Sequence, residues 1–572
     1  MLSALVKLSP PWLLGCLRNR AWLIVAFALL LVVGVRVRLR DMPLERDEGE
    51  YAYAGQLILQ GVPPYHDAFN MKLPGTYAAY ALILAVFGQT PGGIHLGLAL
   101  VNVATIVLIF RLGRKLLDDA GGATAAVAYA LMSLSPNVLG LAGHATHFVV
   151  LPAVGGILLL LRAVETRRTK ILFASGLLFG LAFLMKQHGI FFGLFAGLLL
   201  WWSRFGPPLP VGNDRSVRRA GLRDEGELPP AFRWRDILRD LGWFGTGYAA
   251  PYLLTCLILW AAGVFPQFWF WTVTYGGKYA SAVPLVKAAD MTSAALRAIV
   301  GPNILFWLLP WVGAIMMWWD RRLDANRRFL LTALLICSLA SISVGFYFRE
   351  HYFILLLPVL ALLIAVAVSR SLRLLGRKPS LELFLALAVL VVSALATGAV
   401  LIGNGALWFS LTPARAVEET YGSTVFGDAR TAADLIAANT SPNARIAVIG
   451  SEPEIYFYAR RRSATGHIYV YALMERQPYA AKMQAQMIQQ IEAARPEYVV
   501  FVQNQLSWLA QPDSEKQLFD WWPGYWAANL ELVRTLNTRQ GAADFDETKP
   551  APPTASPQAN NYLLVFKRKS GT

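Results

Sequence analysis

Charged residues are scarce in this chain of 572 residues, at 15% of the total, and cysteine is nearly absent. The three cysteines, Cys16, Cys256 and Cys337, lie in or beside apolar segments, which excludes a disulfide framework and a cysteine metal site. Acids are outnumbered, with 36 Asp and Glu against 52 Lys and Arg, and the formal net charge is +16. In a soluble protein that imbalance would favour nucleic acid. The sequence has no RNP-like, helix-turn-helix or zinc-finger pattern, so we expect no nucleic acid partner.

Hydrophobic residues are abundant instead, at 56%, with a mean hydropathy of +0.44. They form repeated runs of about 17–25 residues, the length at which a helix crosses a bilayer. Examples are Ala21–Val37, Ile94–Phe110, Leu241–Gly263, Phe329–Phe346 and Leu383–Ile402. The sequence therefore predicts a multi-pass integral membrane protein, and the basic excess is explained by the rule that cytoplasmic loops are positive.

The basic clusters predict the topology. Lys and Arg gather at residues 7–20, 111–115, 162–170, 204–239, 321–328 and 370–378. If all six clusters are cytoplasmic, the apolar segments between them cross the membrane in pairs. The eleven spans that satisfy this condition are 21–39, 94–112, 120–138, 147–163, 171–186, 189–203, 241–263, 299–319, 329–347, 352–369 and 381–402. We expect a cytoplasmic N-terminus with an uncleaved first span, an extracytoplasmic C-terminus and a bacterial inner (plasma) membrane. The short apolar segment Thr76–Gly88 is expected to lie at the outer interface.

Two regions follow from this topology. Residues 1–402 are predicted to form a mainly α-helical transmembrane domain with outer loops at 40–93 and 264–298. The second loop is rich in aromatic residues, which is typical of an interfacial belt. Residues 403–572 are more polar and predict a small extracytoplasmic α/β domain. Its expected elements are strands at Arg445–Gly450, Tyr498–Val502 and Tyr562–Lys567, helices at Ala432–Ala438 and Tyr479–Ala494, and a flexible proline-rich excursion at Lys549–Asn561.

Polar residues gather just outside the first span. The run Arg46-Asp47-Glu48-Gly49-Glu50-Tyr51 places three acids within four residues. One explanation is the N-terminus of a helix, where acids are favoured by the dipole. The other is a carboxylate poised at the membrane surface as a general base. Lys72 follows on the same loop, and a cation near a carboxylate at a lipid surface suits an anionic leaving group.

These elements resemble the C-type membrane glycosyltransferases, most closely the branch of protein O-mannosyltransferases and lipid A aminoarabinose transferases. That branch carries an Asp-Glu pair in the first outer loop, a Tyr-Ala-rich helix, a Gly-x-Pro-Tyr-like turn and a Lys-Pro-Pro-like element. The corresponding segments here are Asp47-Glu48, Tyr51–Gln60, Gly61–Tyr65 and Lys72-Leu73-Pro74, the last differing from Lys-Pro-Pro by one residue. Two further matches are Gly180–Lys186, and Arg349–Phe353 followed by Leu357-Pro358. The resemblance covers residues 20–405 and extends only loosely into the tail.

The resemblance implies a glycosyltransferase that moves a hexose or pentose from a polyprenyl-phosphate donor to an acceptor hydroxyl on the outer face, usually with inversion. The acceptor would be a lipid, a glycan or a protein. Asp47 would be the general base, and Glu48 would orient Asp47 or the acceptor. A phosphate in a low-dielectric site needs cationic partners. The expected partners are Lys72, Lys186, Arg349 and His351, with Lys72 contributing more than Lys186. The expected cavity residues are Tyr51, Tyr65, His147 and Tyr352.

Several of these residues have simpler explanations. Lys186 can snorkel to the interface from a helix end, and Arg349 can pair with Glu350 in a tight loop. His144 and His147 can cap a polar cavity or bind a metal, but two histidines three residues apart are weak support for a metal site.

We expect no metal or other cofactor. The oxygens of Asp47, Glu48 and Glu50 nonetheless suit Mg²⁺ or Mn²⁺ and leave that alternative open. Arg36, Arg38 and Arg40 end the first span on the outer side, where they are expected to contact lipid headgroups.

Two other classes of protein compete with the enzyme. A transporter or flippase of a lipid-linked sugar often shows internal duplication and broken helices near the midplane. The sequence shows neither clearly, and its polar groups cluster at the outer face. A non-catalytic scaffold would require neither Asp47 nor Lys72. The sequence leaves open the sugar, the acceptor, the stereochemical outcome, the oligomeric state and the role of the tail.

Overall fold

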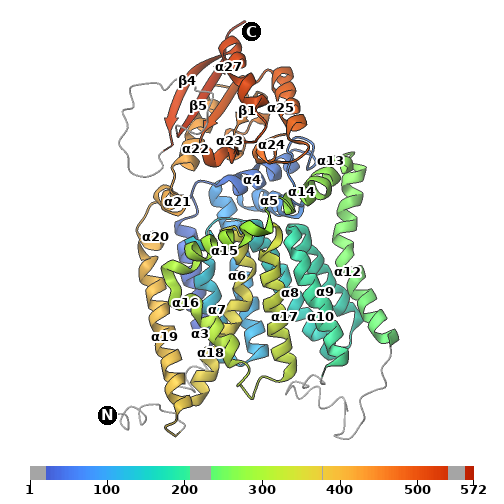
Figure 1. Cartoon of the computed structure of the whole chain (residues 1–572), viewed down its shortest axis with the longest axis vertical. Helices are drawn as coiled ribbons and strands as arrows, with labels where there is room; N and C mark the ends of the chain where they lie inside the picture. The colour runs from blue at the N-terminus through green and yellow to red at the C-terminus, as the bar shows by residue number, and fades with distance from the viewer. Residues whose placement is uncertain (1–20, 207–233, 376–377, 539–560, 572) are drawn as a thin grey trace.

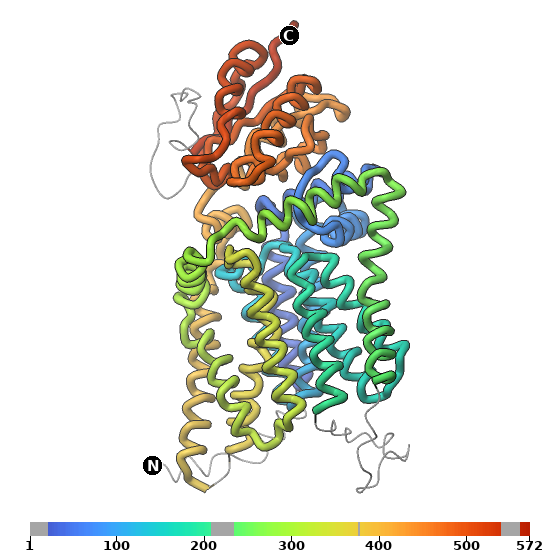
Figure 2. Tube along the Cα trace, turned by 45° about the vertical axis from the view of Figure 1, so that its right-hand side comes forward, coloured from blue at the N-terminus to red at the C-terminus, as the bar shows by residue number. Residues whose placement is uncertain are grey.

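The computed structural model describes residues 21–206, 234–375, 378–538 and 561–571. These residues form a tall helical bundle with a smaller α/β layer stacked on one end (Figure 1). A tier of short helices lies between the two (Figures 1 and 2). The described chain enters the bundle with α3 (Ala21–Arg38) and leaves it with α19 (Leu381–Gly403), after which it continues into the α/β layer.

The bundle helices coincide with the predicted spans. Between α3 and α19 they are α6 (Pro91–Leu116), α7 (Asp119–Ser133), α8 (Ala145–Thr166), α9 (Thr169–Met185), α10 (Ile190–Phe205), α12 (Trp234–Ala261), α16 (Ile304–Met316), α17 (Ala325–Ile342) and α18 (Leu357–Leu374). Within the described ranges, eight helical segments are long and apolar enough to cross a membrane, one of them combining α15 (Leu285–Val300) with α16. The integral membrane character is therefore confirmed, and the count of eleven spans stays a prediction.

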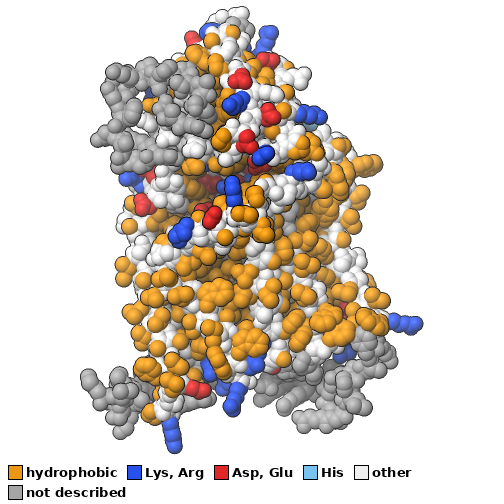
Figure 3. Space-filling view, viewed as in Figure 1, with side chains coloured by type: hydrophobic (Ala, Val, Ile, Leu, Met, Phe, Trp, Pro, Cys, Tyr) orange, Lys and Arg blue, Asp and Glu red, His pale blue; other side chains and the backbone are white. Residues whose placement is uncertain are grey.

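The sides of the bundle are apolar where they would face lipid. On α19, the side chains of Phe384, Leu385, Val391 and Leu395 are each more than half exposed. Figure 3 shows hydrophobic side chains covering the flank of the bundle, with charged side chains mainly near its two ends. Exposed apolar surface costs roughly 25 cal/mol per Å² in water. In a lipid bilayer this surface has no such cost, so the flank of the bundle is suited to face lipid.

Ion pairs join the loops at the end of the bundle farthest from the sheet. Arg373, in the last turn of α18, pairs with Asp118 between α6 and α7 at 2.8 Å and with Asp320 between α16 and α17. The described basic clusters gather at this end: 111–115, 162–170, 321–328 and 370–375. Residues 7–20 and most of 204–239 lie outside the described ranges. If the apolar segments cross the membrane in pairs, as predicted, the basic loops between the pairs must lie at one end of the bundle.

The opposite end of the bundle carries the tier of short helices. The first outer loop contributes α4 (Arg46–Leu59) and α5 (Gly75–Phe87), which pack against each other. The short apolar segment at Thr76–Gly88 thus lies in this tier. The second outer loop contributes α13 (Phe265–Trp269), the π-helical turn η3 (Phe270–Tyr275), α14 (Gly276–Ala280) and α15, which run across the end of the bundle (Figure 2).

The α/β layer contains a five-stranded sheet in the order β2-β1-β3-β5-β4. The strands are β1 (Arg445–Ile449), β2 (Arg462–Ser463), β3 (Tyr498–Gln503), β4 (Leu530–Asn537) and β5 (Tyr562–Arg568). β1 pairs in parallel with β2 and β3, whereas β5 is antiparallel to β3 and β4. The helices of the layer are α22 (Val425–Ala438), α23 (Glu454–Ala459), α24 (Tyr471–Met474), α25 (Ala480–Ala494), α26 (Gln505–Trp508) and α27 (Gln517–Asn529). The short helices α20 (Gly405–Phe409) and α21 (Pro413–Tyr421) lead from α19 to this layer.

The predicted strands correspond to β1, β3 and β5, and the predicted helices to parts of α22 and α25. The sequence did not predict β2 or β4. The proline-rich excursion falls, except for Asn561, outside the described residues. A small sheet beyond a mainly helical bundle confirms the predicted fold class.

The arginines that end α3 correct one expectation. Arg36 is buried and donates hydrogen bonds to two backbone carbonyls at and beyond the end of α7. Arg38 donates to two carbonyls at α20 and just after it. Both side chains therefore satisfy backbone acceptors inside the protein, because helix ends leave carbonyls without intrahelical partners. Only Arg40 remains at the surface, paired with Asp41.

Candidate functional site

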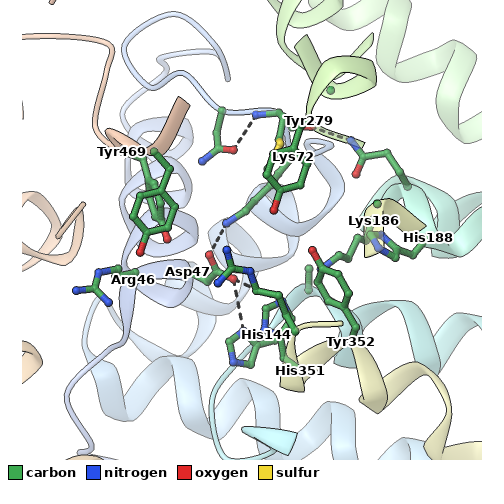
Figure 4. A pocket seen from close by; sticks show the side chains of 18 of the residues that line it. Arg46, Asp47, Lys72, His144, Lys186, His188, Tyr279, His351, Tyr352 and Tyr469 are labelled. Atoms are coloured by element: carbon green, nitrogen blue, oxygen red, sulfur yellow. Dashed lines mark hydrogen bonds and ion pairs between the residues drawn. The ribbon is translucent and has the colours of Figure 1, made fainter. Parts of the chain in front are cut away.

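A cavity of about 310 Å³ lies where the tier of short helices meets the bundle and the α/β layer. Its lining comes from α4, the loop before α5, the turns η2 (Gln187–Gly189), η5 (Val344–Phe346) and η6 (Glu350–Leu355), the helices η3 and α14, and a segment near α24. Figure 4 shows Asp47 near its centre, with Arg46 and Tyr469 on one side and Lys186, His188 and Tyr352 on the other.

Asp47 owes its position to the start of α4. Glu45 caps this helix by accepting a hydrogen bond from the amide of Glu48, and the Glu48 carboxylate accepts one in return from the amide of Glu45. This reciprocal capping box fixes the first turn, in which Asp47 lies. The Asp47 side chain keeps 16% exposure, on the cavity side. The acids in this turn therefore begin a helix, as one explanation of the sequence had it, and one of them, Asp47, also faces the cavity, as the other explanation required.

Lys72 is held between two carboxylates. Its Nζ lies 2.6 Å from Asp47 Oδ1 and 2.6 Å from Glu50 Oε2. Burial alone would lower the pKa of Lys72, but the two carboxylates outweigh it and raise that pKa well above its ordinary value. Burial alone would also raise the pKa of Asp47, yet Lys72 and the nearby histidines hold it well below its ordinary value. Asp47 is therefore ionised at neutral pH, the state that a proton acceptor needs before the reaction.

Lys186 and Arg349 supply the positive charge on the other side of the cavity. Lys186 is the single residue between α9 and η2, and its Nζ lies 4.1 Å from the ring centroid of Tyr352. Among the described residues, no carboxylate lies within 4 Å of either cation as an ion-pair partner. Burial lowers the pKa of Lys186 to about 7. Arg349 and the protonated form of Lys186, which have no such partner in the part of the chain that the structure describes, are available to an anion that enters the cavity.

Glu48 lies beside the cavity and does not line it. Its side chain is 2% exposed. It accepts a hydrogen bond from the amide of Gly143 at 2.6 Å and lies 3.0 Å from Nε2 of His95. These contacts tie the first turn of α4 to α6 and to the loop before α8.

Two other predicted cavity residues also lie outside the lining. The Tyr65 hydroxyl donates to the backbone carbonyl of Lys72 at 2.7 Å, so Tyr65 shapes the loop that carries this lysine. His147 is buried in α8 and donates through Nε2 to a backbone carbonyl 3.1 Å away. In contrast, Tyr51 and Tyr352 line the cavity, as does His351, the expected phosphate partner.

Asp47, His144 and His351 form a compact group. The two imidazole rings stack with centroids 4.2 Å apart, His144 Nδ1 lies 3.7 Å from Asp47 Oδ2, and His351 Nε2 lies 3.9 Å from the same oxygen. Their candidate ligand atoms all lie within 4.8 Å of one another. One carboxylate and two imidazoles could hold a transition metal. A cation there would share Asp47 with Lys72, whose ammonium group already lies 2.6 Å from it.

Sequence reasoning missed the part of the lining that comes from the distant tail. Tyr469, Tyr471 and Glu475 lie more than 400 residues after Asp47 and line the same cavity. The Glu475 carboxylate accepts a hydrogen bond of 2.5 Å from the Tyr275 hydroxyl of η3. For the η3 side of the cavity, the aromatic stripe of the second outer loop was the available signal. Its expected role as an interfacial belt accounts for the exposed Trp269, whereas Tyr275 faces the cavity.

Comparison with known proteins gives one family and several structures. Residues 72–209 match the family described as dolichyl-phosphate-mannose-protein mannosyltransferase. No curated protein matches the whole sequence significantly.

Two solved proteins resemble the structure over most of the chain. ArnT from Cupriavidus metallidurans bound to undecaprenyl phosphate has a TM-score of 0.55 and 16% identity, covering 96% of this chain and 98% of that one. The archaeal oligosaccharyltransferase AglB from Archaeoglobus fulgidus, in complex with an inhibitory peptide and a dolichol-phosphate, has a TM-score of 0.50 and 13% identity, covering 85% and 70%. At these identities the likeness concerns the fold.

Proposed function

This chain has the fold of the C-type membrane glycosyltransferases, and we propose that it transfers a sugar from a polyprenyl-phosphate donor to an acceptor hydroxyl. One observation carries the proposal: an ionised carboxylate, Asp47, shares a cavity at the end of the bundle with two cations that lack an acidic partner among the described residues, Lys186 and Arg349. A base and an anion site in one cavity are what transfer from a lipid phosphate requires.

The reaction proceeds by displacement at the anomeric carbon. Asp47 takes the proton of the acceptor hydroxyl as that oxygen attacks, and a new glycosidic bond forms. The bond between the anomeric carbon and the phosphate oxygen breaks, and its electron pair leaves with the polyprenyl phosphate. Attack from the face opposite the leaving group inverts the anomeric centre. Lys186 and Arg349 stabilise the charge that grows on the phosphate as the bond breaks.

The contacts of the cations lead us to assign Lys72 a different role from Lys186 and Arg349. Lys72 is engaged by Asp47 and Glu50, so we assign it to hold Asp47 ionised and in place. Lys186 and Arg349 take the phosphate, with His351 beside Asp47. Glu48 fixes the first turn of α4 and acts on the reaction only through Asp47. The proposed reaction needs no metal, because Lys186 and Arg349 already supply positive charge for the leaving phosphate.

The placement in the membrane follows from the two ends of the protein. The described basic loops lie at the end opposite the cavity, which favours a cytoplasmic location for that end. The cavity and residues 403–572 then lie on the extracytoplasmic side of a bacterial inner membrane, and residues 1–402 form the membrane domain. A donor with a polyprenyl tail reaches the cavity from the bilayer, and its acceptor is a lipid, a glycan or a protein.

The purified protein in proteoliposomes tests the proposal. The donors are undecaprenyl-phosphate mannose and undecaprenyl-phosphate aminoarabinose with radiolabelled sugars, and a membrane extract supplies the acceptors. We expect release of undecaprenyl phosphate together with transfer of the label to an acceptor. A flippase would instead move the intact donor between leaflets without releasing undecaprenyl phosphate, and that outcome would replace the proposal.

A further inference from the structure

The parallel half of the sheet points its carboxyl ends at the active site. β1 is parallel to both β2 and β3, and residues that follow β1 and β2 contact the tier of short helices. Glu452 follows β1 and contacts α4, whereas Gly466 follows β2 and contacts the loop before α5. In open α/β sheets the carboxyl ends of the strands are where function is usually placed. Here that edge meets the two loops that carry Asp47 and Lys72.

The first contact lies at the start of α4. Arg46, which directly precedes Asp47, donates to Glu452 Oε1 from Nη2 at 2.9 Å and from Nε at 3.2 Å. The Glu452 carboxylate is fully buried, and its other oxygen accepts hydrogen bonds from Ser507 Oγ at 2.6 Å and from the amide of Ser451 at 2.8 Å. Glu452 is thus a rigid anchor, because the domain itself fixes its second oxygen.

The second contact is a backbone approach one turn further along. A Cβ added to Gly49 would lie 2.6 Å from both the Cβ and the backbone nitrogen of Glu454, at the start of α23. A glycine is the residue that lets two helices come this close. Since Gly49 lies two residues after Asp47, any separation of α4 from α23 moves the base.

The third contact holds the lysine loop. The amide of Phe69 donates to the carbonyl of Gly466 at 2.7 Å, and a Cβ added to Gly466 would lie 2.3 Å from the Phe69 ring. The same ring stacks on Trp271 of η3, with centroids 5.7 Å apart. Phe69 lies three residues before Lys72. The α/β layer therefore contacts the segments that carry Asp47 and Lys72, whose side chains lie 2.6 Å apart. The residues after β1 contact the first segment, and those after β2 contact the second.

We propose that the C-terminal α/β domain sets the geometry of the Asp47–Lys72 pair, with Arg46, Gly49, Glu452 and Gly466 as positioning residues. This inference rests on the proposed transferase function. The donor cations are not part of this contact, since Lys186 lies between α9 and η2 and Arg349 directly precedes η6. Loosening the contact displaces the base while leaving the phosphate site intact, so turnover falls and donor affinity does not. Misplacing a catalytic group by about 1 Å costs on the order of 10²-fold in rate.

Alanine substitution at the two glycines tests the inference. Gly49→Ala and Gly466→Ala should each lower kcat by about 10- to 100-fold, with a donor KM and an undecaprenyl phosphate affinity close to those of the wild type. Gly427→Ala is the matched control, because Gly427 lies in α22 of the same domain and a Cβ there meets nothing within 4 Å. Gly427→Ala should keep the wild-type kcat.

A second variant covers the case in which the glycine variants fail to fold. Glu452→Gln keeps the shape of the anchor and removes its charge, and it should also lower kcat without raising the donor KM. Arg46→Lys, which retains the positive charge, should recover part of the loss seen in Arg46→Ala. Wild-type kcat in Gly49→Ala, or a parallel loss of donor affinity in every variant, would overturn the inference. An inactive wild-type protein would instead refute the proposed function.

Discussion

The pKa of Lys186 predicts how donor binding depends on pH. Burial lowers this pKa to about 7, so in the free protein Lys186 loses its proton as the pH rises through neutrality. Only the protonated amine attracts a phosphate. The donor is a phosphodiester whose single charge does not change in this range. Donor affinity should therefore be complete only well below pH 7, should be about half of that at pH 7, and should fall further as the pH rises.

The size of the effect follows from the protonated fraction of Lys186. The apparent dissociation constant equals the intrinsic one divided by the competent fraction, which gives a rise in donor KM of about 50-fold between pH 7 and pH 9. Lys186→Arg removes the dependence, because a guanidinium stays protonated at every pH in this range. Its donor KM should be flat from pH 6 to pH 9, while kcat keeps any dependence that belongs to other groups.

The measurement is the initial rate of polyprenyl phosphate release at varied donor and saturating acceptor, across that pH range. Lys170→Arg is the matched control, since Lys170 is an exposed lysine at the opposite end of α9. It should reproduce the wild-type profile. A flat wild-type donor KM, or an unchanged slope in Lys186→Arg, would refute the assignment of Lys186 to the phosphate.

The remaining predictions concern the base, the lysine beside it, metal and topology. Asp47→Asn should lower transfer by about 10²–10⁴-fold, the usual cost of losing a general base, with an unchanged thermal unfolding profile; near-normal turnover would remove Asp47 from the mechanism. Lys72→Met should lower kcat more than it changes the donor KM, and the opposite split would return the phosphate to Lys72. Activity should persist in EDTA, and a complete loss restored by a divalent ion would assign a metal to the Asp47 group. With the native cysteines replaced, a cysteine at position 515 should be labelled from outside intact cells and one at position 170 should not; the reverse pattern would invert the topology.

Hydropathy predicted the bundle well because a lipid environment imposes long apolar helices. The start of α4 was one of the two explanations that the sequence offered, since acids are favoured at a helix N-terminus by the dipole. The strand β4 was missed. It lies at the edge of the sheet, alternates only partly between buried and exposed residues, and carries an irregularity between Leu532 and Arg534.

The partners of the charged residues could not be predicted from the sequence, because they depend on tertiary contacts. Lys72, Lys186 and Arg349 look alike as isolated cations, and only the fold shows that Lys72 is held by two carboxylates. Likewise, Arg36 sits at a span end, where lipid contact is the ordinary expectation, yet a neighbouring helix end offers it carbonyl acceptors. The contributions of the tail, such as Tyr469, depend on contacts across more than 400 residues, for which a single sequence carries no signal.

Transfer of a sugar from a polyprenyl phosphate with Asp47 as the base can be tested in cells. The most direct measurement compares, by mass spectrometry, the glycolipids, glycans and glycoproteins of cells that carry the wild-type protein or Asp47→Asn at equal abundance. A species bearing one added sugar should be present with the wild type and absent with Asp47→Asn. A polyprenyl-phosphate sugar should accumulate in the variant. Identical profiles in the two strains would contradict the account.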